Sequence, residues 1–266
     1  MLQREAQRWT RLAPRALLGT AVAALALLLS GCEFWQYNIA NGGTPPKTRG
    51  QEDIKSKIAG GARPVAMTLE EVCGHRFNEL LSFLRNYGYS GTFHNVNTAG
   101  CSGNGYGNAI FHLGSRVAFA GHPSGVLRLI YTTNNRPHRV GAMAVAIGAG
   151  SNRAIVWVTH LEAADDSAAS AQAWELLQSV HYWRDVTGWL PVVGGDFNLT
   201  PNQFPMRDWC AQFREALSCS SSAPTHAAGK IDYLFSPTWR WGRTYISANS
   251  DHRRLAAGIT GAGPSG

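Results

Sequence analysis

The sequence predicts an α/β domain whose layers contain a substantial share of antiparallel sheet. Short runs of β-forming residues recur along most of the chain, and turn-forming residues separate them. Two longer segments instead carry apolar residues three and four positions apart, which is typical of helices packed on a sheet. The composition of residues 33–266 shows no break, so we expect one domain there, with a separate N-terminal segment before it.

The first part of this domain alternates strands with helices. Phe34–Ile39 has the pattern of a short strand, and Pro64–Leu69 is an apolar run of the buried type. Apolar residues at helical spacing predict helices over Glu52–Ala59 and roughly over His75–Asn86. The segment Ser90–Gly107 is rich in Gly, Asn, Ser and Thr, so we expect a loop.

Strands dominate the rest of the chain, with one long helix among them. Five short β-rich runs come first: Asn108–Leu113, Arg116–Ala120, Leu127–Thr132, Val140–Ile147 and Ala154–Thr159. Ala168–Asp185 is expected to be helical, because its large apolar residues fall on related faces. The final expected strands are Pro191–Gly194, Lys230–Phe235 and Thr244–Ser247.

Residues 1–31 have the features of an export signal. Four Arg residues form a basic head, and Leu17–Leu29 is an uncharged apolar stretch, shorter than the about 20 residues that a spanning helix needs. The run Leu29-Ser30-Gly31-Cys32 resembles the end of a bacterial lipoprotein signal, in which the Cys is lipidated. The alternative is an ordinary secretory signal that ends near a Cys. We therefore expect a secreted protein or a bacterial cell-surface lipoprotein anchored to the membrane through Cys32.

Composition and charge exclude some classes and leave others open. Of the 266 residues, 44% are hydrophobic and 15% charged, which excludes a disordered chain. Residues 1–31 contain four Arg and one Glu, so their removal lowers the formal net charge of +7 by three, to +4. This mild positive excess suits a polyanionic substrate, but it is also an ordinary solubility charge.

The cysteines fit an oxidising compartment. Apart from Cys32, the chain has four, which allow three disulfide pairings. The local pairing, Cys73 with Cys101 and Cys210 with Cys219, is the preferred one. No CxxC or Cys/His cluster of the zinc type is present, so the sequence does not favour a metal bound by sulfur.

Polar residues stand where several apolar runs end. They are His160, Asp196, Asn198, Asn38, Glu70, Glu71, Asp232, Asp251 and His252. Because the apolar runs are costly to expose, each is expected to cross the core and to deliver its polar residue to a rim of the sheet, where α/β folds bind ligands. Taken singly, Asp196-Phe197-Asn198 is equally explained by a turn with Asx hydrogen bonds, and a lone His by a structural role. Together, carboxylates and amides suit Mg²⁺, and two His can carry protons near neutral pH.

This ordered set resembles the endonuclease/exonuclease/phosphatase superfamily, the group that includes deoxyribonuclease I. The matching segments are Tyr37-Asn38-Ile39, Leu69-Glu70-Glu71-Val72, Thr159-His160-Leu161, Gly195-Asp196-Phe197-Asn198, Ile231-Asp232-Tyr233 and Ser250-Asp251-His252. The resemblance implies a four-layered α/β sandwich, in which two packed mixed β-sheets are flanked by helices. It also implies metal-dependent hydrolysis of a phosphoester by a domain spanning residues 32–266.

The resemblance further implies a metal site. Asn38 and Glu71 match metal-binding positions, and Asp251 matches the residue beside the metal in the last motif. The expected cofactor is Mg²⁺, with Mn²⁺ as an alternative. The family often has Gln before the metal-binding Glu, whereas this chain has Glu70, which is expected to add a negative charge near the cation.

The remaining matches imply catalytic roles. His252 corresponds to the general base, and Asp232 to the carboxylate that orients it. Asp196 and Asn198 correspond to residues that orient the attacking water and the phosphate. His160 corresponds to a His that contacts the phosphate or donates a proton. Independently, a base must take a proton from water as it attacks, and an imidazole held by a carboxylate can do so.

The favoured substrate is a nucleic acid, cleaved by a metal-dependent nuclease that we expect to act as a monomer. Four Arg residues could contact backbone phosphates, or be ordinary strand-surface charges: Arg116, Arg128, Arg136 and Arg139. Tyr89 and Tyr106 could stack on bases. The alternative is a phosphatase or sphingomyelinase-like phosphodiesterase of the same fold, for which Trp239 and Trp241 would be an interfacial pair or simply packing residues. A third class, a surface-binding lipoprotein with an inert site, is disfavoured because the polar set is intact.

Overall fold

The computed structural model describes residues 33–40, 49–98, 100–131, 140–149, 152–236, 239–248 and 252–262. The expected signal at residues 1–31, the expected lipid anchor Cys32, and the candidate residue Asp251 lie outside these ranges. None of the helices in the described ranges combines the length and the apolar character that crossing a bilayer requires.

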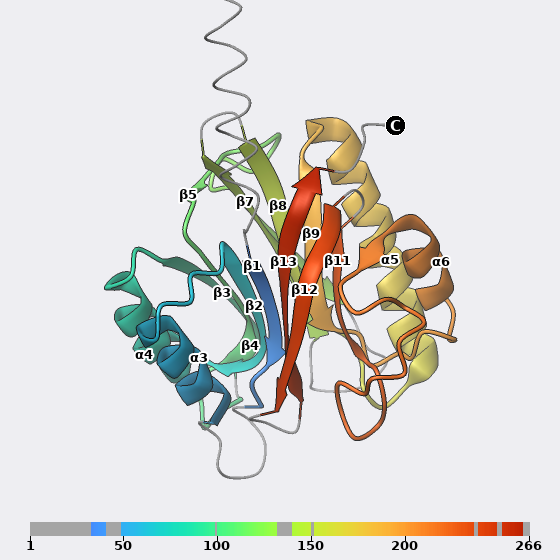
Figure 1. Ribbon diagram of the computed structural model, residues 1–266, viewed down its shortest axis with the longest axis horizontal. Helices are drawn as coiled ribbons and strands as arrows, with labels where there is room; N and C mark the ends of the chain where they lie inside the picture. Colours follow the sequence, from blue (N-terminus) through green and yellow to red (C-terminus); the bar gives the residue numbers. More distant parts are fainter. Residues whose placement is uncertain are drawn as a thin grey trace, which may run out of the picture.

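Two mixed sheets pack against each other in the middle of the molecule (Figure 1). The first has the order β12-β13-β1-β2-β4-β3. Its strands are β1 (Glu33–Asn38), β2 (Ala66–Cys73), β3 (Ser90–Asn97), β4 (Tyr106–His112), β12 (Trp239–Ala248) and β13 (Arg253–Ala262). The second has the order β10-β11-β9-β8-β7-β5, and β6 also pairs with β7. Its strands are β5 (Ser115–Arg116), β6 (Val126–Tyr131), β7 (Val140–Ala149), β8 (Asn152–His160), β9 (Leu190–Asp196), β10 (Arg214–Glu215) and β11 (Asp232–Ser236).

Helices cover the outer face of each sheet. Helices α3 (Arg49–Ala59) and α4 (Gly74–Arg85) lie against the first sheet, and α5 (Asp166–Thr187) and α6 (Met206–Gln212) lie against the second (Figure 1). Three apolar clusters fill the spaces between these layers, one between the sheets and one under each helical layer. The expected four-layered α/β sandwich is therefore confirmed.

Strand alternation assigns each side chain of β1 to one of these spaces. Phe34 belongs to the cluster between the sheets, whereas Trp35 and Tyr37 belong to the cluster under α3 and α4. Because side chains two residues apart share a face, Gln36 and Asn38 point into the space between the sheets. The same alternation in β8 and β9 puts the ends of these strands on the inter-sheet face as well.

The strand directions bring these polar ends to one rim. Strand β1 runs parallel to β2, and β8 runs parallel to β9, so each pair ends at the same edge of its sheet. The two sheets approach closely there at Gly194, where an added Cβ would lie 2.1 Å from Thr68 Oγ1. A glycine is required at this position because any side chain would push the sheets apart.

The secondary structure differs from the expectations in five places. Ser90–Gly107 is not all loop, because Ser90–Asn97 forms β3 at the sheet edge, paired with β4. Strand β13 was not expected, since its Ala- and Gly-rich sequence has little β-propensity, yet it lies between β1 and β12. Helix α6 and strand β10 were also not expected. Only the first residue of the expected strand Arg116–Ala120 lies in β5, and Phe119 forms an isolated bridge.

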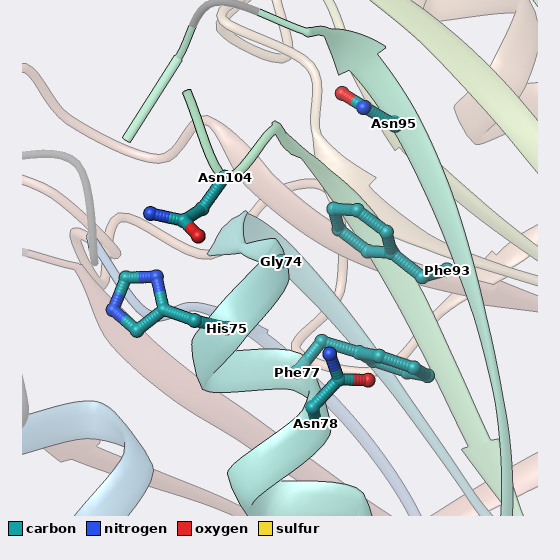
Figure 2. Close-up of a pocket in the computed structure, with 7 residues that line it drawn as sticks. All are labelled: Gly74, His75, Phe77, Asn78, Phe93, Asn95 and Asn104. Carbon is teal, nitrogen blue, oxygen red and sulfur yellow. The ribbon is translucent and has the colours of Figure 1, made fainter. Parts of the chain in front are cut away.

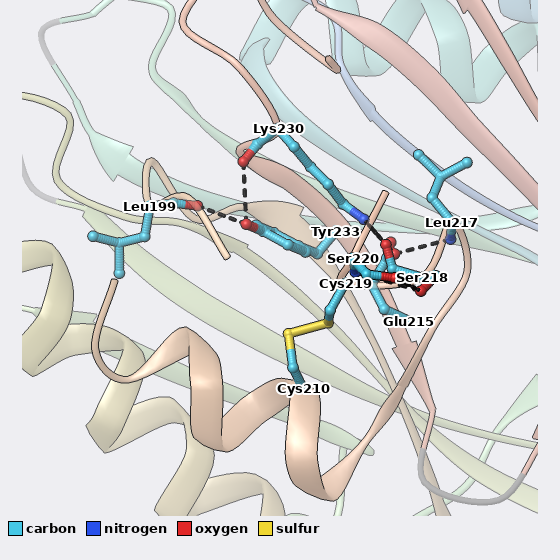
Figure 3. The surroundings of a disulfide bond; sticks show 9 residues. All are labelled: Leu199, Cys210, Glu215, Leu217, Ser218, Cys219, Ser220, Lys230 and Tyr233. Atoms are coloured by element: carbon cyan, nitrogen blue, oxygen red, sulfur yellow. Dashed lines mark hydrogen bonds and ion pairs between the residues drawn. A yellow bond between two sulfur atoms is a disulfide. The ribbon is translucent and has the colours of Figure 1, made fainter. Parts of the chain in front are cut away.

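Two disulfides join segments that are close in sequence, as the preferred pairing predicted. Cys73 is bonded to Cys101, and Cys210 is bonded to Cys219. Figure 3 shows the second bond beside a buried ion pair, in which Lys230 Nζ lies 2.6 Å from Glu215 Oε2. Lys230 Nζ also donates to the carbonyl of Ser218 at 2.6 Å. These contacts fix the segment that leads into β11.

Candidate active site

The candidate site lies at the rim where β1, β2, β8, β9 and β11 end or begin. Each of these strands contributes a polar residue from its inter-sheet face, next to the apolar cluster that fills the rest of this space. Asn38, Asp196 and Asp232 are at most 1% exposed. Burial on this scale requires polar groups to be paired with one another.

His252 and Asp232 form a hydrogen-bonded pair. His252 Nδ1 lies 3.0 Å and 3.2 Å from the two carboxylate oxygens of Asp232. Since a carboxylate only accepts hydrogen bonds, Nδ1 carries the hydrogen and the neutral ring leaves a lone pair on Nε2. This Nε2 faces the centre of the site, 3.4 Å from Asn38 Nδ2 and 3.7 Å from Asp196 Oδ2. Such an imidazole can accept a proton at Nε2.

Asn38 links the carboxylates of the two sheets. Its Nδ2 donates to Glu71 Oε1 at 3.1 Å and to Asp196 Oδ2 at 3.0 Å. Its Oδ1 accepts a hydrogen bond from the backbone N–H of Ala40 at 3.1 Å, which fixes the amide at the end of β1. Asn38 therefore holds two carboxylates near each other without adding a charge.

A β-bulge explains why consecutive residues, Glu70 and Glu71, both reach the site. The pairing of β2 with β4 shifts between Leu69 and Val72, and Glu71 has a φ of 57°. In a regular strand, adjacent side chains point to opposite faces, whereas a bulge redirects one of them. A positive φ is unfavourable for a Glu, so the backbone conformation at Glu71 marks a position with a functional constraint.

Glu70 corrects the expected charge of the site. It is fully buried, and Gln36 Nε2 donates to its Oε2 at 3.0 Å. Burial is the main cause that raises the pKa of Glu70 well above its ordinary value, and the negative charges of Asp232 and Asp196 raise it further. The raised pKa favours the neutral carboxylic acid, which can hydrogen-bond as the Gln expected from the family resemblance would.

Asp196, Asn198 and His160 complete the site from the second sheet. Burial raises the pKa of Asp196, the charge of Asp232 adds to this, and His160, His252 and Asn38 oppose it. The backbone N–H of Asn198 donates to Asp196 Oδ1 at 3.0 Å, so the Asx turn expected as an alternative is present within the site. Asn198 has a φ of 53°, and its Nδ2 donates to the carbonyl of Leu161. His160 Nε2 lies 3.7 Å from Asp196 Oδ2.

A profile of the Endonuclease/Exonuclease/phosphatase family matches residues 35–253. The chain belongs to this family. Its members are hydrolases of phosphoester bonds. Comparison of the sequence with curated proteins gave no match.

Several solved structures share the fold of this chain. The human Nocturnin catalytic domain with bound sulfate is 22% identical, with a TM-score of 0.71 over 88% of this chain and 95% of that one. The mannosyl-6-phosphatase Bt3783 of Bacteroides thetaiotaomicron is 13% identical, with a TM-score of 0.63 over 86% and 99%. Truncated TDP2 of Caenorhabditis elegans is 16% identical, with a TM-score of 0.65 over 86% and 96%. At these identities the likeness is one of fold.

The structure of this Endonuclease/Exonuclease/phosphatase domain gathers seven of the eight predicted site residues. They are Asn38, Glu71, His160, Asp196, Asn198, Asp232 and His252; the eighth, Asp251, lies outside the described residues. The partly exposed members of the set are Glu71, His160 and Asn198.

Two further site residues were not predicted. Gln36 Nε2 donates to Glu70 and, at 3.1 Å, to Asp232 Oδ1, and its place on the inter-sheet face was a signal that could have revealed it. The ring of His226 stacks on that of His252, with centroids 4.5 Å apart and planes inclined by 26°. The backbone N–H of Ala228 donates to His226 Nδ1 at 3.0 Å, so the neutral His226 ring carries its hydrogen on Nε2. No sequence pattern pointed to His226.

Several proposed substrate contacts are wrong or untested. Tyr89 cannot stack on a base, because it is 2% exposed and its hydroxyl donates to the carbonyl of Pro64. Arg116 pairs with Ile147 of β7, whereas His160 pairs with Gly141 of the same strand. Six residues of strand separate the two positions, so Arg116 lies roughly 20 Å from the rim and is too far away to contact a substrate there. Arg136, Arg139 and the side chains of Trp239 and Trp241 lie outside the described residues.

The donor set fits a divalent cation. Asp196, Asp232 and His252 offer atoms within 4.8 Å of one another, but Asp232 and His252 already satisfy each other. The carboxylates of Glu71 and Asp196 lie on either side of Asn38, and Glu71 is the partly exposed one of the two. Burial raises the pKa of Asp196, the charge of Asp232 raises it further, and a cation in this space would oppose both effects.

Proposed function

We propose that this chain is a secreted or surface-anchored, Mg²⁺-dependent phosphodiesterase, and that its substrate is a nucleic acid. The observation that carries the proposal is the hydrogen-bonded pair of His252 and Asp232, in which His252 turns Nε2 toward the Asn38–Glu71–Asp196 cluster. A proton acceptor directed at a cluster of cation-binding oxygens is the arrangement that hydrolysis of a phosphoester by water requires.

In this proposal, His252 takes the proton of the attacking water at Nε2. Asp232 keeps the hydrogen on Nδ1 and stabilises the imidazolium that forms. Asp196 and Asn198 orient the water and the phosphate, and His160 contacts the phosphate or donates a proton to the leaving oxygen. Removing one such group typically costs about two to three decades in rate.

Glu71 and Asn38 would hold the cation, with Asp251 beside it. For this, the Asn38 amide would turn so that Oδ1, which accepts from the backbone N–H of Ala40 in this structure, faces the cation. Carboxylate and amide oxygens are the ligands that Mg²⁺ prefers, and Mn²⁺ accepts the same set. Bound there, the cation would neutralise charge that develops on the phosphate oxygens.

Arg128 supports a polyanionic substrate. It is exposed on β6 and pairs with Met143 of β7. On the same strand, Gly141 pairs with His160 and stands two residues from Met143. This places a cation roughly 7 Å along the sheet from the rim, near enough to contact a neighbouring phosphate. The two disulfides support export, because they persist in oxidising compartments.

A substrate panel tests the proposal. The protein without residues 1–31 is incubated with plasmid DNA, single-stranded RNA, sphingomyelin vesicles and mannose 6-phosphate, with Mg²⁺ or with EDTA. We expect Mg²⁺-dependent cleavage of nucleic acid, loss of activity in EDTA and in the His252→Ala variant, and rescue of the EDTA-treated protein by Mg²⁺ or Mn²⁺. Turnover of sphingomyelin or the sugar phosphate alone would replace the nuclease assignment by the lipase-type or phosphatase alternative.

A further inference from the structure

A pocket of about 400 Å³ lies where α4 begins (Figure 2). Its lining comes from three segments: the first turn of α4, strand β3 and the loop before β4. The lining residues are Gly74, His75, Phe77, Asn78, Phe93, Asn95 and Asn104. None of them carries a fixed charge, which distinguishes this pocket from the acidic site described above.

The lining offers an aromatic wall, of which Phe93 is the more exposed ring, and several hydrogen-bonding groups. The rings of Phe77 and Phe93 stack with centroids 5.3 Å apart and planes inclined by 25°, and Figure 2 shows them along one side of the pocket, facing Asn104 and His75. Among the described residues, the amide of Asn78 has no hydrogen-bond partner, and Asn104 uses only Nδ2, which donates to the carbonyl of Cys101. Donors and acceptors therefore both remain available.

The pocket is built before any ligand arrives. The disulfide between Cys73 and Cys101 ties the start of α4 to the loop before β4, and the N–H of Gly74 donates to the carbonyl of Gly105 at 3.0 Å. An added Cβ at Gly74 would lie 2.2 Å from the carbonyl oxygen of Asn104, so only glycine permits this close approach. A preformed pocket loses little conformational entropy on binding.

The pocket is close to the candidate active site. Gly74 follows Glu71 by three residues, so their Cα atoms are at most about 11 Å apart. This upper limit equals about three stacked nucleotides, so a base adjoining a phosphate at Glu71 falls within reach of the pocket. A substrate chain whose phosphate lies at Glu71 can therefore place a neighbouring group in the pocket.

We propose that this pocket binds a nucleobase of the substrate strand, next to the phosphate that is cleaved. An aromatic wall stacks on the face of any base, and an Asn amide matches the paired donor and acceptor on a base edge. A nucleobase is favoured over a neutral sugar because a cation stands beside the pocket: Arg128 Nη2 lies 3.5 Å from the carbonyl oxygen of Phe93, where it can meet the adjoining phosphate. The inference rests on the proposed nuclease function.

Cleavage kinetics test this subsite. We compare wild type, Asn78→Ala and Phe93→Leu on a single-stranded oligonucleotide and on the same strand with abasic units flanking the cleaved bond. Asn202→Ala, another exposed Asn, is the matched control. We expect Asn78→Ala to raise KM about fivefold to tenfold on the normal strand, with kcat unchanged and no effect on the abasic strand or on bis(p-nitrophenyl) phosphate. An equal effect on both strands, or no effect of either variant, would overturn the proposal.

A binding measurement separates failure of the subsite from failure of the proposed function. NMR titration of the full mature chain in EDTA, with adenosine and with methyl mannoside as probes, needs no catalysis. We expect saturable binding of adenosine, weakened by Asn78→Ala and by Phe93→Leu but not by Asn202→Ala. Binding of the mannoside alone would overturn the nucleobase assignment. Adenosine binding by a protein that cleaves no phosphodiester would support the pocket and refute the nuclease.

Discussion

Replacing Asp232 by Asn probes the proposed base while changing almost no volume. The carboxylate of Asp232 accepts hydrogen bonds from both Gln36 Nε2 and His252 Nδ1. An amide has one accepting oxygen, so one of these donors would face an N–H group instead. If that donor is His252, its hydrogen must move to Nε2, and the ring can no longer accept the proton of water.

The expected loss follows from the distance between the charges. At the 3.0 Å that separates Nδ1 from Oδ2, two unit charges attract by about 5.5 kcal/mol at an effective dielectric constant of about 20. The amide dipole keeps part of this stabilisation of the imidazolium, so the barrier should rise by roughly 3–4 kcal/mol. This corresponds to a loss of about two to three decades in kcat.

The assay is steady-state hydrolysis at saturating Mg²⁺, with thermal unfolding as the test of folding. Asp185→Asn, an exposed carboxylate on α5, is the matched control and should retain full activity. A folded Asp232→Asn enzyme with kcat within threefold of wild type would refute the role of His252 as a base held by Asp232.

Three further predictions test neighbouring parts of the site. Folding raises the pKa of Glu70 above its ordinary value of 4.5, so the unfolded chain releases this proton first as the pH rises. The free energy of unfolding therefore decreases above about pH 4.5, and Glu70→Gln should remove the part of this decrease that Glu70 causes. In EDTA, the urea midpoint of Glu70→Gln should match wild type near pH 4 and exceed it at pH 8, and a lower midpoint at pH 8 would contradict the neutral state of Glu70. His226→Ala should lower kcat about twofold to tenfold by removing the ring stacked on His252, whereas His226→Phe should restore it; equal kcat values for the two variants would show that stacking has no role. Thr225 Oγ1 accepts the buried N–H groups of Ile231 and Asp232, so Thr225→Val should lower the free energy of unfolding by about 2–4 kcal/mol, measured by urea denaturation, while Thr225→Ser should not.

Much of the site could be predicted because strand alternation is visible in the sequence. In β8, Val156 and Val158 face the other sheet and stand two residues apart, and the same spacing leads on to His160. In β9, Val192 faces the other sheet, and steps of two residues lead from it to Asp196. If each strand crosses the same apolar core between the sheets and ends in a polar residue, these polar residues are expected to lie close together at one rim. The order of the motifs gave the same answer through the family resemblance.

Strand β13 is an element that local sequence patterns do not predict. Its residues Ala256 and Ala257 have low β-propensity, and the segment forms a strand because β1 and β12 supply partners on both sides. Its placement also has a consequence for the site, because His252 directly precedes β13. The backbone N–H of Arg253 donates to the carbonyl of Thr225 at 2.7 Å, which ties this strand to the segment that carries His226.

The two glutamates at the end of β2 show why geometry was needed to assign their roles. Alternation alone directs Glu70, not Glu71, into the space between the sheets, since Glu70 shares a face with Thr68. The bulge adds Glu71 to the same site, closer to solvent, and leaves Glu70 buried among other carboxylates. Burial raises the pKa of Glu70, and the charges of Asp232, Asp196 and Glu71 raise it further, so ionisation of the buried carboxyl is disfavoured in that space. A single strand irregularity thus separates a partly exposed carboxylate suited to a cation from a buried one that supports Asp232 through Gln36.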